Sequence, residues 1–236
     1  MEQRPQPRAM PVDAKDYSSK FSLGSFVNAH CQVRDSLKYQ PDRILVIGVG
    51  VGLEPVLLRH RFHCDVCTLD IDADFGPDYV GSVHSMKMFS DQQFDVVIAS
   101  HVLEHLPFSY FRDCLAELAR VARHAIVYLP YGGRHLEWKI ILSQRFQYSL
   151  RLRLPPWRRV DGEHPDLQQM QHYWECGYPG FSVKRISSIM AEYFRIDETY
   201  HNPDWKYSLN FLLTSRRAPA NEVPASKDVT DRRLVG

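Results

Sequence analysis

The sequence predicts an α/β fold with a doubly wound, largely parallel sheet. Three apolar runs, at residues 44–47, 96–99 and 125–129, have the composition of strands that are buried on both faces. Helix-forming segments separate these runs, and strands that alternate with helices pair in parallel through right-handed crossovers. The first run also ends in a glycine-rich turn. With 236 residues, the chain is long enough to bury one sizeable core.

The glycine-rich turn predicts a ligand-binding loop. Gly48, Gly50 and Gly52 end the first strand, and residues 53–61 follow as a short helix. Glycine reaches positive φ and allows a ligand to approach the backbone, while the start of a helix offers unpaired N–H groups. A dinucleotide fingerprint, G-x-G-x-x-G, needs its third glycine where this chain has Leu53. The pattern therefore disfavours a nicotinamide cofactor.

A second strand, predicted over residues 65–72, ends in acidic residues. Asp70 lies about 18 residues beyond Gly52, where nucleotide-binding α/β folds place a carboxylate for ribose hydroxyls. A carboxylate can accept hydrogen bonds from both hydroxyls at once. Asp72 is the alternative acid at this strand end.

The most specific stretch is Phe-Asp-Val-Val-Ile-Ala-Ser-His-Val-Leu-Glu-His-Leu-Pro at residues 94–107. Together with the G-x-G-x-G loop, it resembles the class I S-adenosylmethionine-dependent methyltransferases, and within them the type 11 methyltransferase group. The resemblance covers roughly residues 40–130. It implies a Rossmann-like, seven-stranded sheet with an antiparallel final strand. It also implies S-adenosyl-L-methionine as cofactor, with methyl transfer by in-line displacement.

The same resemblance implies where the cofactor binds. The residues are Gly48, Gly50 and Gly52 at the methionine part, Asp70 at the ribose, Ser82 and Val83 at the adenine, and Ser100 at the end of the fourth strand. Two positions depart from the family pattern: Val46 and Ser82 stand where the family usually has acids. These departures keep open an alternative, a non-catalytic binding or regulatory module on the same fold.

His101 and His105 are the candidate catalytic residues. Both sit near the carboxyl end of the fourth strand, and imidazole titrates in the range that a general base needs. A helix-end hydrogen-bonding role is the alternative for His105. His101, Glu104 and His105 also form H-x-x-E-H, which resembles the E-x-x-E-H metal site of some metal-dependent methyltransferases. A metal-dependent O-methyltransferase is therefore a further alternative.

Residues 131–180 interrupt the alternation and predict a helical or irregular lid over a substrate pocket. Up to residue 160 this segment holds seven basic residues and one acid, Glu137, with interleaved aromatics. We expect it to recognise a small-molecule acceptor, such as a carbohydrate or an envelope precursor, and a surface helix over residues 135–154 is an alternative. Candidate substrate contacts are Tyr131, His172, Trp174 and Glu175. For the stretch that contains His172, Trp174 and Glu175, the alternative is a buried aromatic anchor with no contact to substrate.

The remaining segments complete a single domain at residues 21–217. We expect helices over residues 21–39, 108–123 and 182–193, a short strand at 80–83, and a final hairpin at 194–200 and 208–214. We expect residues 1–20 to form a flexible arm. Residues 218–236 are rich in Pro, Ser and charged residues, and we expect them to form a disordered tail.

Composition narrows the function classes. The formal net charge of +1 gives no general field for nucleic acid, and no apolar run approaches the ~20 residues of a membrane span. We therefore expect a cytoplasmic protein, with its oligomeric state left open. The five cysteines are scattered, and Cys64 and Cys67 would point to opposite faces of a strand, which disfavours a metal or redox site.

Overall fold

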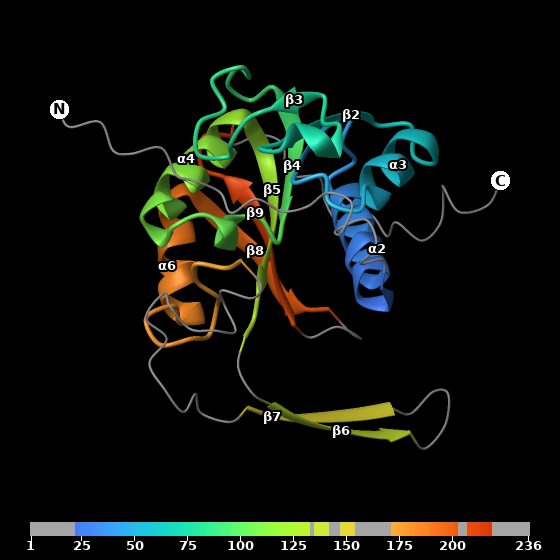
Figure 1. Cartoon of the computed structure of the whole chain (residues 1–236), viewed down its shortest axis with the longest axis vertical. Coiled ribbons are helices and arrows are strands. Elements are labelled where there is room, and N and C mark those ends of the chain that lie inside the picture. The colour runs from blue at the N-terminus through green and yellow to red at the C-terminus, as the bar shows by residue number, and fades with distance from the viewer. Residues whose placement is uncertain (1–21, 133–134, 142–146, 154–170, 203–206, 219–236) are drawn as a thin grey trace.

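The computed structural model describes residues 22–132, 135–141, 147–153, 171–202 and 207–218. Its centre is a seven-stranded sheet in the order β3-β2-β1-β4-β5-β9-β8 (Figure 1). The strands are β1 (Arg43–Ile47), β2 (Asp65–Asp70), β3 (Tyr79–Val80), β4 (Phe94–Ser100), β5 (Ala122–Pro130), β8 (Phe194–His201) and β9 (Ser208–Ser215). The predicted arm (1–20) lies outside the described residues, as does all of the predicted tail except its first residue.

Strand directions match the predicted doubly wound sheet. Strands β1 to β5 run parallel to one another, whereas β9 runs antiparallel to both β5 and β8. The expected antiparallel final strand is therefore confirmed. Because the parallel strands end at one edge of the sheet, the segments that follow β1, β2 and β4 meet there.

Helices cover both faces of the sheet (Figure 1). α2 (Leu23–Leu37) and α3 (Leu53–His60) lie on one face, and α4 (Phe111–Val121) and α6 (Val183–Tyr193) on the other. Two apolar clusters match these layers. One contains Ile44 and Val46 and packs toward α2 and α3, and the other contains Leu45 and Ile47 and packs toward α4 and α6.

Helix α2 is fixed to the sheet by a buried carboxylate. Asp35 is 0% exposed, and its Oδ2 accepts hydrogen bonds from the Tyr128 hydroxyl, at 2.5 Å, and from the Tyr200 hydroxyl. Arg34 and Lys38 approach the other oxygen at 2.9 and 3.3 Å. This network joins α2 to β5 and β8, so it also sets the position of the α2 residues that line the pocket described below.

Two predicted elements differ from the structure. The third strand was expected at residues 80–83, but β3 covers only Tyr79–Val80. Residues 135–154, expected to be helical or irregular, form instead two antiparallel strands, β6 (His135–Ile141) and β7 (Gln147–Arg153). The apolar residues of this segment recur at every second position, which is the period of a strand and not of a helix.

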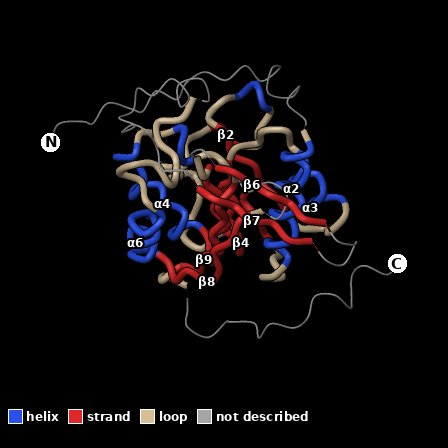
Figure 2. Tube along the Cα trace, turned by 90° about the horizontal axis from the view of Figure 1, so that it is seen from below, coloured by secondary structure: helices blue, strands red, loops and turns tan. Residues whose placement is uncertain are grey.

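The β6–β7 hairpin carries an exposed apolar face. Three cross-strand pairs lie on it, namely Leu136 opposite Leu152, Trp138 opposite Leu150 and Ile140 opposite Tyr148. These side chains are 46–67% exposed. The hairpin lies beyond the carboxyl ends of the parallel strands, as two perpendicular views show (Figures 1 and 2). A lid function for residues 131–180 stays a prediction.

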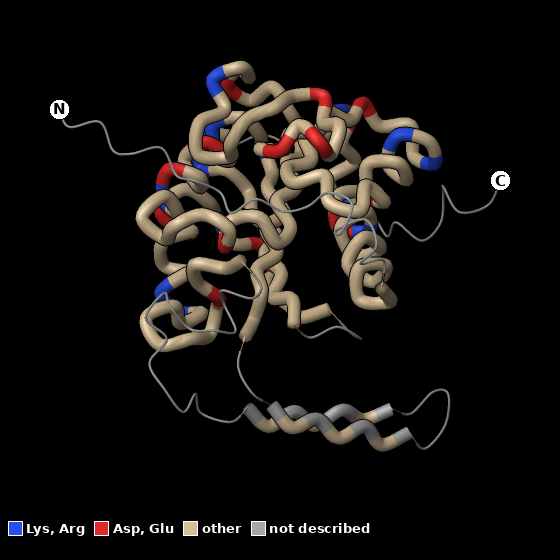
Figure 3. The backbone as a smooth tube through the Cα atoms, viewed as in Figure 1, with Lys and Arg blue, Asp and Glu red and all other residues tan. Residues whose placement is uncertain are grey.

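Other sequence-based expectations concern thiols, charge and membranes. All five cysteines are free, and Cys64 and Cys67 pack on opposite faces of the sheet. Acidic and basic positions are interspersed over the described body (Figure 3). Within the described residues, no helix combines the length and the apolar character needed to cross a membrane.

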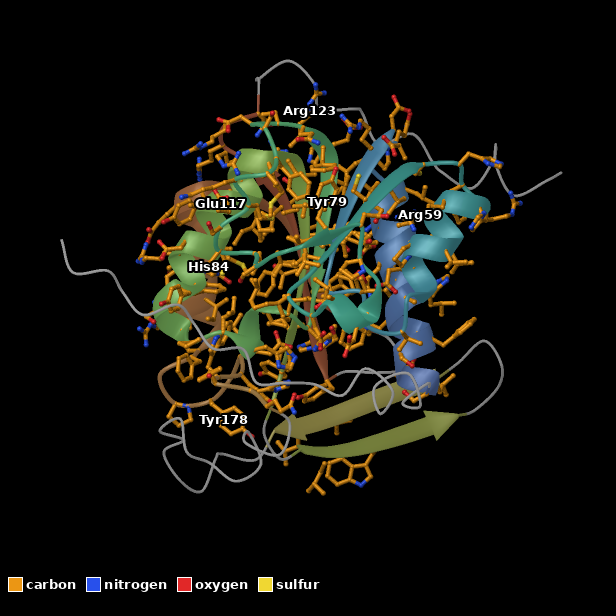
Figure 4. The ribbon with its side chains drawn as sticks, turned by 45° about the horizontal axis from the view of Figure 1, so that its top comes forward. Arg59, Tyr79, His84, Glu117, Arg123 and Tyr178 are labelled. Atoms are coloured by element: carbon orange, nitrogen blue, oxygen red, sulfur yellow. The ribbon has the colours of Figure 1, made fainter. Side chains whose placement is uncertain are left out.

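The Asp35 network gives a stability prediction. Replacement of Tyr128 by Phe removes one donor from a fully buried carboxylate, so we expect a loss of about 1–3 kcal/mol in the free energy of unfolding. Urea unfolding measures it. The control is Tyr79→Phe, on the partly exposed ring of β3 (Figure 4), which should leave stability unchanged. Equal stability of the two variants would contradict the role given to Asp35.

Candidate active site

A pocket opens at the carboxyl ends of β1, β2 and β4, with α2 along its side. It brings together residues that lie far apart in the sequence but were all predicted as site residues. These are Gly48, Gly50, Asp70, Ser82, Val83, Ser100, His101 and His105. Gly52 does not line the pocket; it is the residue before α3, with φ of 70°. The sheet topology thus gathers nearly all the predicted cofactor and catalytic residues in one cavity.

The glycine loop requires glycine for a steric reason at Gly48. Its φ is +79°, and a Cβ there would lie 2.6 Å from the Val102 side chain. The Gly48 N–H donates to the carbonyl of Leu69 at 2.8 Å. The loop therefore turns tightly between β2 and the segment after β4, and its backbone faces the pocket.

Asp70 holds this loop from the neighbouring strand. Its Oδ2 accepts from the Val49 N–H at 2.8 Å, and its Oδ1 accepts from the Asp72 N–H at 3.0 Å. Each carboxylate oxygen can accept a second hydrogen bond. Asp70 can therefore shape the loop and still accept from a ligand in the pocket, which it lines.

Helix α2 contributes polar pocket residues that sequence reasoning missed. The Asn28 amide donates to the Ser100 hydroxyl at 2.9 Å, and its Oδ1 accepts from Asn202 at 3.1 Å. Gln32 is 3% exposed, and its buried Oε1 has no hydrogen-bond partner among the described residues. The amphipathic pattern of the helix indicated a buried face, but nothing in it showed which polar residues would reach the pocket.

Glu54 is the acid that sequence reasoning overlooked. Val46, where the resembled family usually has an acid, is 1% exposed and packs among the apolar residues beneath α2 and α3. Glu54, in the first turn of α3, lines the pocket and is 9% exposed. Burial raises its pKa to about 7, so its charge changes in the physiological range. A carboxyl group is thus present beside the loop, on a different element.

His101 lies at the end of β4 in a left-handed conformation, with φ of 55°. Such backbone is costly for a residue with a Cβ, and it occurs often at functional sites. Its Nε2 lies 3.1 Å from the Ser208 hydroxyl, and its Nδ1 lies 3.4 Å from Oε1 of Glu104. The imidazole thus stands between the pocket and a buried acid.

Glu104 and Glu175 form a buried cluster with two further imidazoles behind His101. Both acids are 0% exposed. The His105 Nδ1 lies 3.0 Å from the Gln171 carbonyl oxygen, and the His172 Nδ1 lies 2.7 Å from Oε1 of Glu175. Oε1 of Glu175 also accepts from the Tyr207 hydroxyl at 2.8 Å.

The charges of this cluster follow from burial and from mutual contact. Burial lowers the pKa of His105 and so favours its neutral form. Burial also acts against the charged forms of Glu104 and His172. For Glu104 the nearby imidazoles outweigh burial and lower the pKa, and for His172 the hydrogen bond to Glu175 outweighs burial and raises it.

The segment of residues 171–178 closes the site from behind. The Tyr173 N–H donates to the Glu104 carbonyl at 2.9 Å, and the Cys176 N–H donates to the Pro130 carbonyl at 3.0 Å. A Cβ on Gly132 would lie 2.0 Å from Oε2 of Glu175, so only glycine fits there. These contacts bring His172 and Glu175 next to the motif after β4.

The predicted substrate contacts fall into different places. Trp174 is 0% exposed, and its indole N–H donates to the Leu106 carbonyl at 3.1 Å, so the buried-anchor interpretation describes it. His172 and Glu175 lie behind the pocket in the cluster above. Tyr131 packs edge-on against His201 with ring centroids 4.8 Å apart. The prediction that Trp174 contacts the substrate is therefore corrected, since a ligand cannot reach a completely buried ring.

The structure groups the residues of the alternative metal site, His101, Glu104 and His105, differently from the motif. Among the described residues, the group of possible ligands whose atoms lie within 4.8 Å of one another is Glu104, His105 and His172. His101, the first residue of the H-x-x-E-H motif, is not in this group, since it contacts Glu104 from the pocket side. The H-x-x-E-H spacing supplies two of the three residues, and folding supplies the third.

A seven-stranded sheet of this order, with a glycine loop after its first strand and an acid at the end of its second, defines the class I S-adenosylmethionine-dependent methyltransferase fold. Residues 45–125 match a family model described as a methyltransferase domain. This match over about a third of the chain, together with the fold, supports a methyltransferase of this class with S-adenosylmethionine as its cofactor. Comparison with curated protein sequences gives no match.

Solved structures share the fold at low sequence identity. The chain is similar to PH0226 from Pyrococcus horikoshii OT3, with 14% identity, a TM-score of 0.54, and coverage of 85% of this chain and 95% of that one. It is similar to DesVI from Streptomyces venezuelae, with 13% identity, a TM-score of 0.52, and coverage of 87% and 100%. It is also similar to a SAM-dependent methyltransferase from Aquifex aeolicus, with 12% identity, a TM-score of 0.52, and coverage of 87% of this chain and 100% of that one.

The raised pKa of Glu54 predicts a pH-dependent stability. Since its folded pKa is about 7 and the unfolded value about 4.5, the folded state binds the proton more tightly. Its stabilising effect is complete below pH 4.5 and is lost as pH rises through 7. We expect Glu54→Gln to remove this loss, which amounts to ~3 kcal/mol at most. Urea unfolding of the natural chain and of Glu54→Gln at pH 5 and pH 8 measures this effect. The same difference in free energy of unfolding between the two proteins at both pH values would contradict the prediction.

Proposed function

We propose that the pocket binds S-adenosylmethionine and transfers its methyl group by in-line displacement to a nucleophile of a small-molecule acceptor. The observation that carries this proposal is the composition of the pocket. The glycine loop and Asp70 lie at one end of it, and His101 and His105 line it too, at the end of β4. A cofactor and an acceptor can thus meet in one cavity.

Each part of the cofactor has a matching group in the pocket. The loop backbone suits the methionine part, and Asp70 can accept hydrogen bonds from ribose hydroxyls. Glu54 provides a carboxyl group that Val46 cannot, and its ionised form suits the ammonium group of the cofactor. Ser82 and Val83 line the side where the adenine would lie.

The chemical step needs mainly positioning. The sulfonium is already activated, so holding the acceptor in line with the sulfur–methyl bond and excluding water account for most of the acceleration. A base is needed only where the acceptor must lose a proton. His101 suits that role because its imidazole lines the pocket and contacts the buried Glu104.

We propose further that the acceptor is carried at a lipid surface, as a lipid-linked carbohydrate would be. The support comes from the apolar face of the β6–β7 hairpin, which presents Trp138, Tyr148 and four aliphatic side chains to solvent. Aromatic residues favour the interface of a bilayer, and the basic sequence around the hairpin favours anionic headgroups. The hairpin lies beyond the carboxyl ends of the parallel strands (Figures 1 and 2), and residues at those strand ends line the pocket.

Cofactor binding tests the first proposal. Calorimetric titration with S-adenosylhomocysteine should give micromolar binding by the natural chain and binding about 10–100-fold weaker by Asp70→Ala, which loses both the loop contact and the ribose acceptor. The control is Asp74→Ala, an exposed acid in the short helical turn that follows β2. Absence of binding by the natural chain would favour a non-catalytic module, and saturable binding without methyl transfer to any acceptor pool would exclude the catalytic proposal.

Vesicle flotation tests the lipid surface. The natural chain should float with vesicles of phosphatidylglycerol and phosphatidylcholine. The double variant Trp138→Ser/Leu150→Ser should lose most of this binding, because it loses exposed apolar area that the bilayer would bury. The matched control is Leu23→Ser/Val56→Ser, which removes two exposed apolar side chains outside the hairpin. Equal loss in both double variants, or no flotation at all, would overturn the proposal.

A further inference from the structure

We propose that Glu104, His105 and His172 bind a divalent transition-metal ion beside the cofactor pocket, and that the ion holds an oxygen of the acceptor. The site itself is inferred from the geometry of the buried cluster. The role of the ion in catalysis rests on the proposed function. The two parts are tested separately below.

The three side chains are arranged as a ligand set. One ligand atom from each, a carboxylate oxygen and two imidazole nitrogens, lies within 4.8 Å of the other two. Ligands bound to one ion at about 2.1 Å are themselves about 3–3.5 Å apart, so ion binding requires the widest separation in the cluster to shorten by up to about 1.5 Å. The separation of Nε2 of His172 from Oε1 of Glu104, 4.0 Å, fits this requirement.

The carboxylate of Glu104 points to a missing partner. It is 0% exposed, and neither of its oxygens has a hydrogen bond within the described part of the chain. Its neighbours are imidazoles, with Nδ1 of His101 at 3.4 Å and Nε2 of His172 at 4.0 Å. The imidazoles already offset the burial of this carboxylate, and a cation bound among these groups would stabilise its charge further.

The two imidazoles present the correct nitrogen. The Nδ1 of His105 faces the carbonyl of Gln171, which can only accept, so this Nδ1 carries the proton and Nε2 keeps its lone pair. In the same way, the Nδ1 of His172 faces the Glu175 carboxylate and leaves Nε2 toward Glu104. Histidine ligands of metals commonly donate their second N–H to a carbonyl or a carboxylate in this way.

Outer contacts hold this arrangement in place. Glu175 is fully buried and accepts from both His172 and the Tyr207 hydroxyl, at 2.7 and 2.8 Å. The close approach of the Gly132 backbone limits the movement of its carboxylate. The orientation of His172 is therefore set by a second layer of residues, as a preorganised ligand requires.

The ligand types indicate the class of ion. Two imidazoles and one carboxylate favour Mn²⁺, Fe²⁺, Co²⁺ or Zn²⁺ over Mg²⁺ or Ca²⁺, which prefer oxygen ligands. Three protein ligands leave coordination positions open for a substrate or for water. His105 belongs to the cluster and also lines the pocket, so the open positions would face the cofactor side.

The ion then defines the acceptor class, which is a hydroxyl with a second oxygen nearby that can chelate the metal. Coordination lowers the pKa of the hydroxyl, whose proton passes to His101 or to water. The oxygen lone pair forms the new bond to the methyl carbon, and the electrons of the carbon–sulfur bond return to sulfur. The products are a methyl ether, S-adenosylhomocysteine and one proton.

The test is Co²⁺ titration of the full chain after chelator treatment, followed by absorption. We expect one Co²⁺ per chain with d–d bands typical of nitrogen and oxygen ligands. His172→Gln and Glu104→Gln should abolish these bands, and Glu175→Gln, which removes the carboxylate that orients His172, should weaken binding about 10–100-fold. The control is His124→Gln, a partly buried imidazole on β5 that lies outside the cluster.

Each outcome decides one part of the proposal. Binding of S-adenosylhomocysteine by the variants shows that they remain folded. Absence of Co²⁺ bands in the natural chain, or equal loss in His124→Gln, overturns the metal site whatever the activity. Stoichiometric Co²⁺ binding with no methyl transfer to hydroxyl acceptors leaves the site intact and overturns its catalytic role.

Discussion

The carboxylate of Glu104 is the constraint around which the active-site region is arranged. It is completely buried at the end of β4, with imidazoles on either side of it. A charged group can stay in such surroundings only if the neighbouring groups offset its lost hydration. The left-handed turn at His101 and the packing of His172 both bring a nitrogen toward this one side chain. Charge and hydrogen-bonding groups from two separate segments therefore meet at Glu104.

The sheet places this acid next to the cofactor pocket. Parallel strands β1, β2 and β4 end at one edge, so the glycine loop, Asp70 and the turn after β4 converge there. Asp70 then fixes the loop by accepting from the Val49 N–H, while α2 is held over the pocket by Asp35. Binding groups are thus positioned by backbone contacts and buried carboxylates that exist before any ligand arrives.

The segment after β5 serves two distinct purposes. Residues 171–178 return to the sheet, where Cys176 bridges to Tyr131, and the side chains of Trp174 and Glu175 are completely buried. The β6–β7 hairpin instead stands beyond the strand ends with its apolar face in solvent. A single insertion thus completes the interior of the site and also provides an apolar surface on the outside.

The sequence by itself determined the α/β class, the parallel core, the glycine loop and Asp70, because buried strands and tight turns leave local patterns of apolar residues and glycine. It also placed Glu104 and His105 on one short turn. Only the tertiary structure decided that His172 joins them, 67 residues after His105, and that Glu54 lines the pocket while Val46 packs in the core. Contacts between distant segments leave no periodic signal, since they arise from how the strand ends and the insertion pack together.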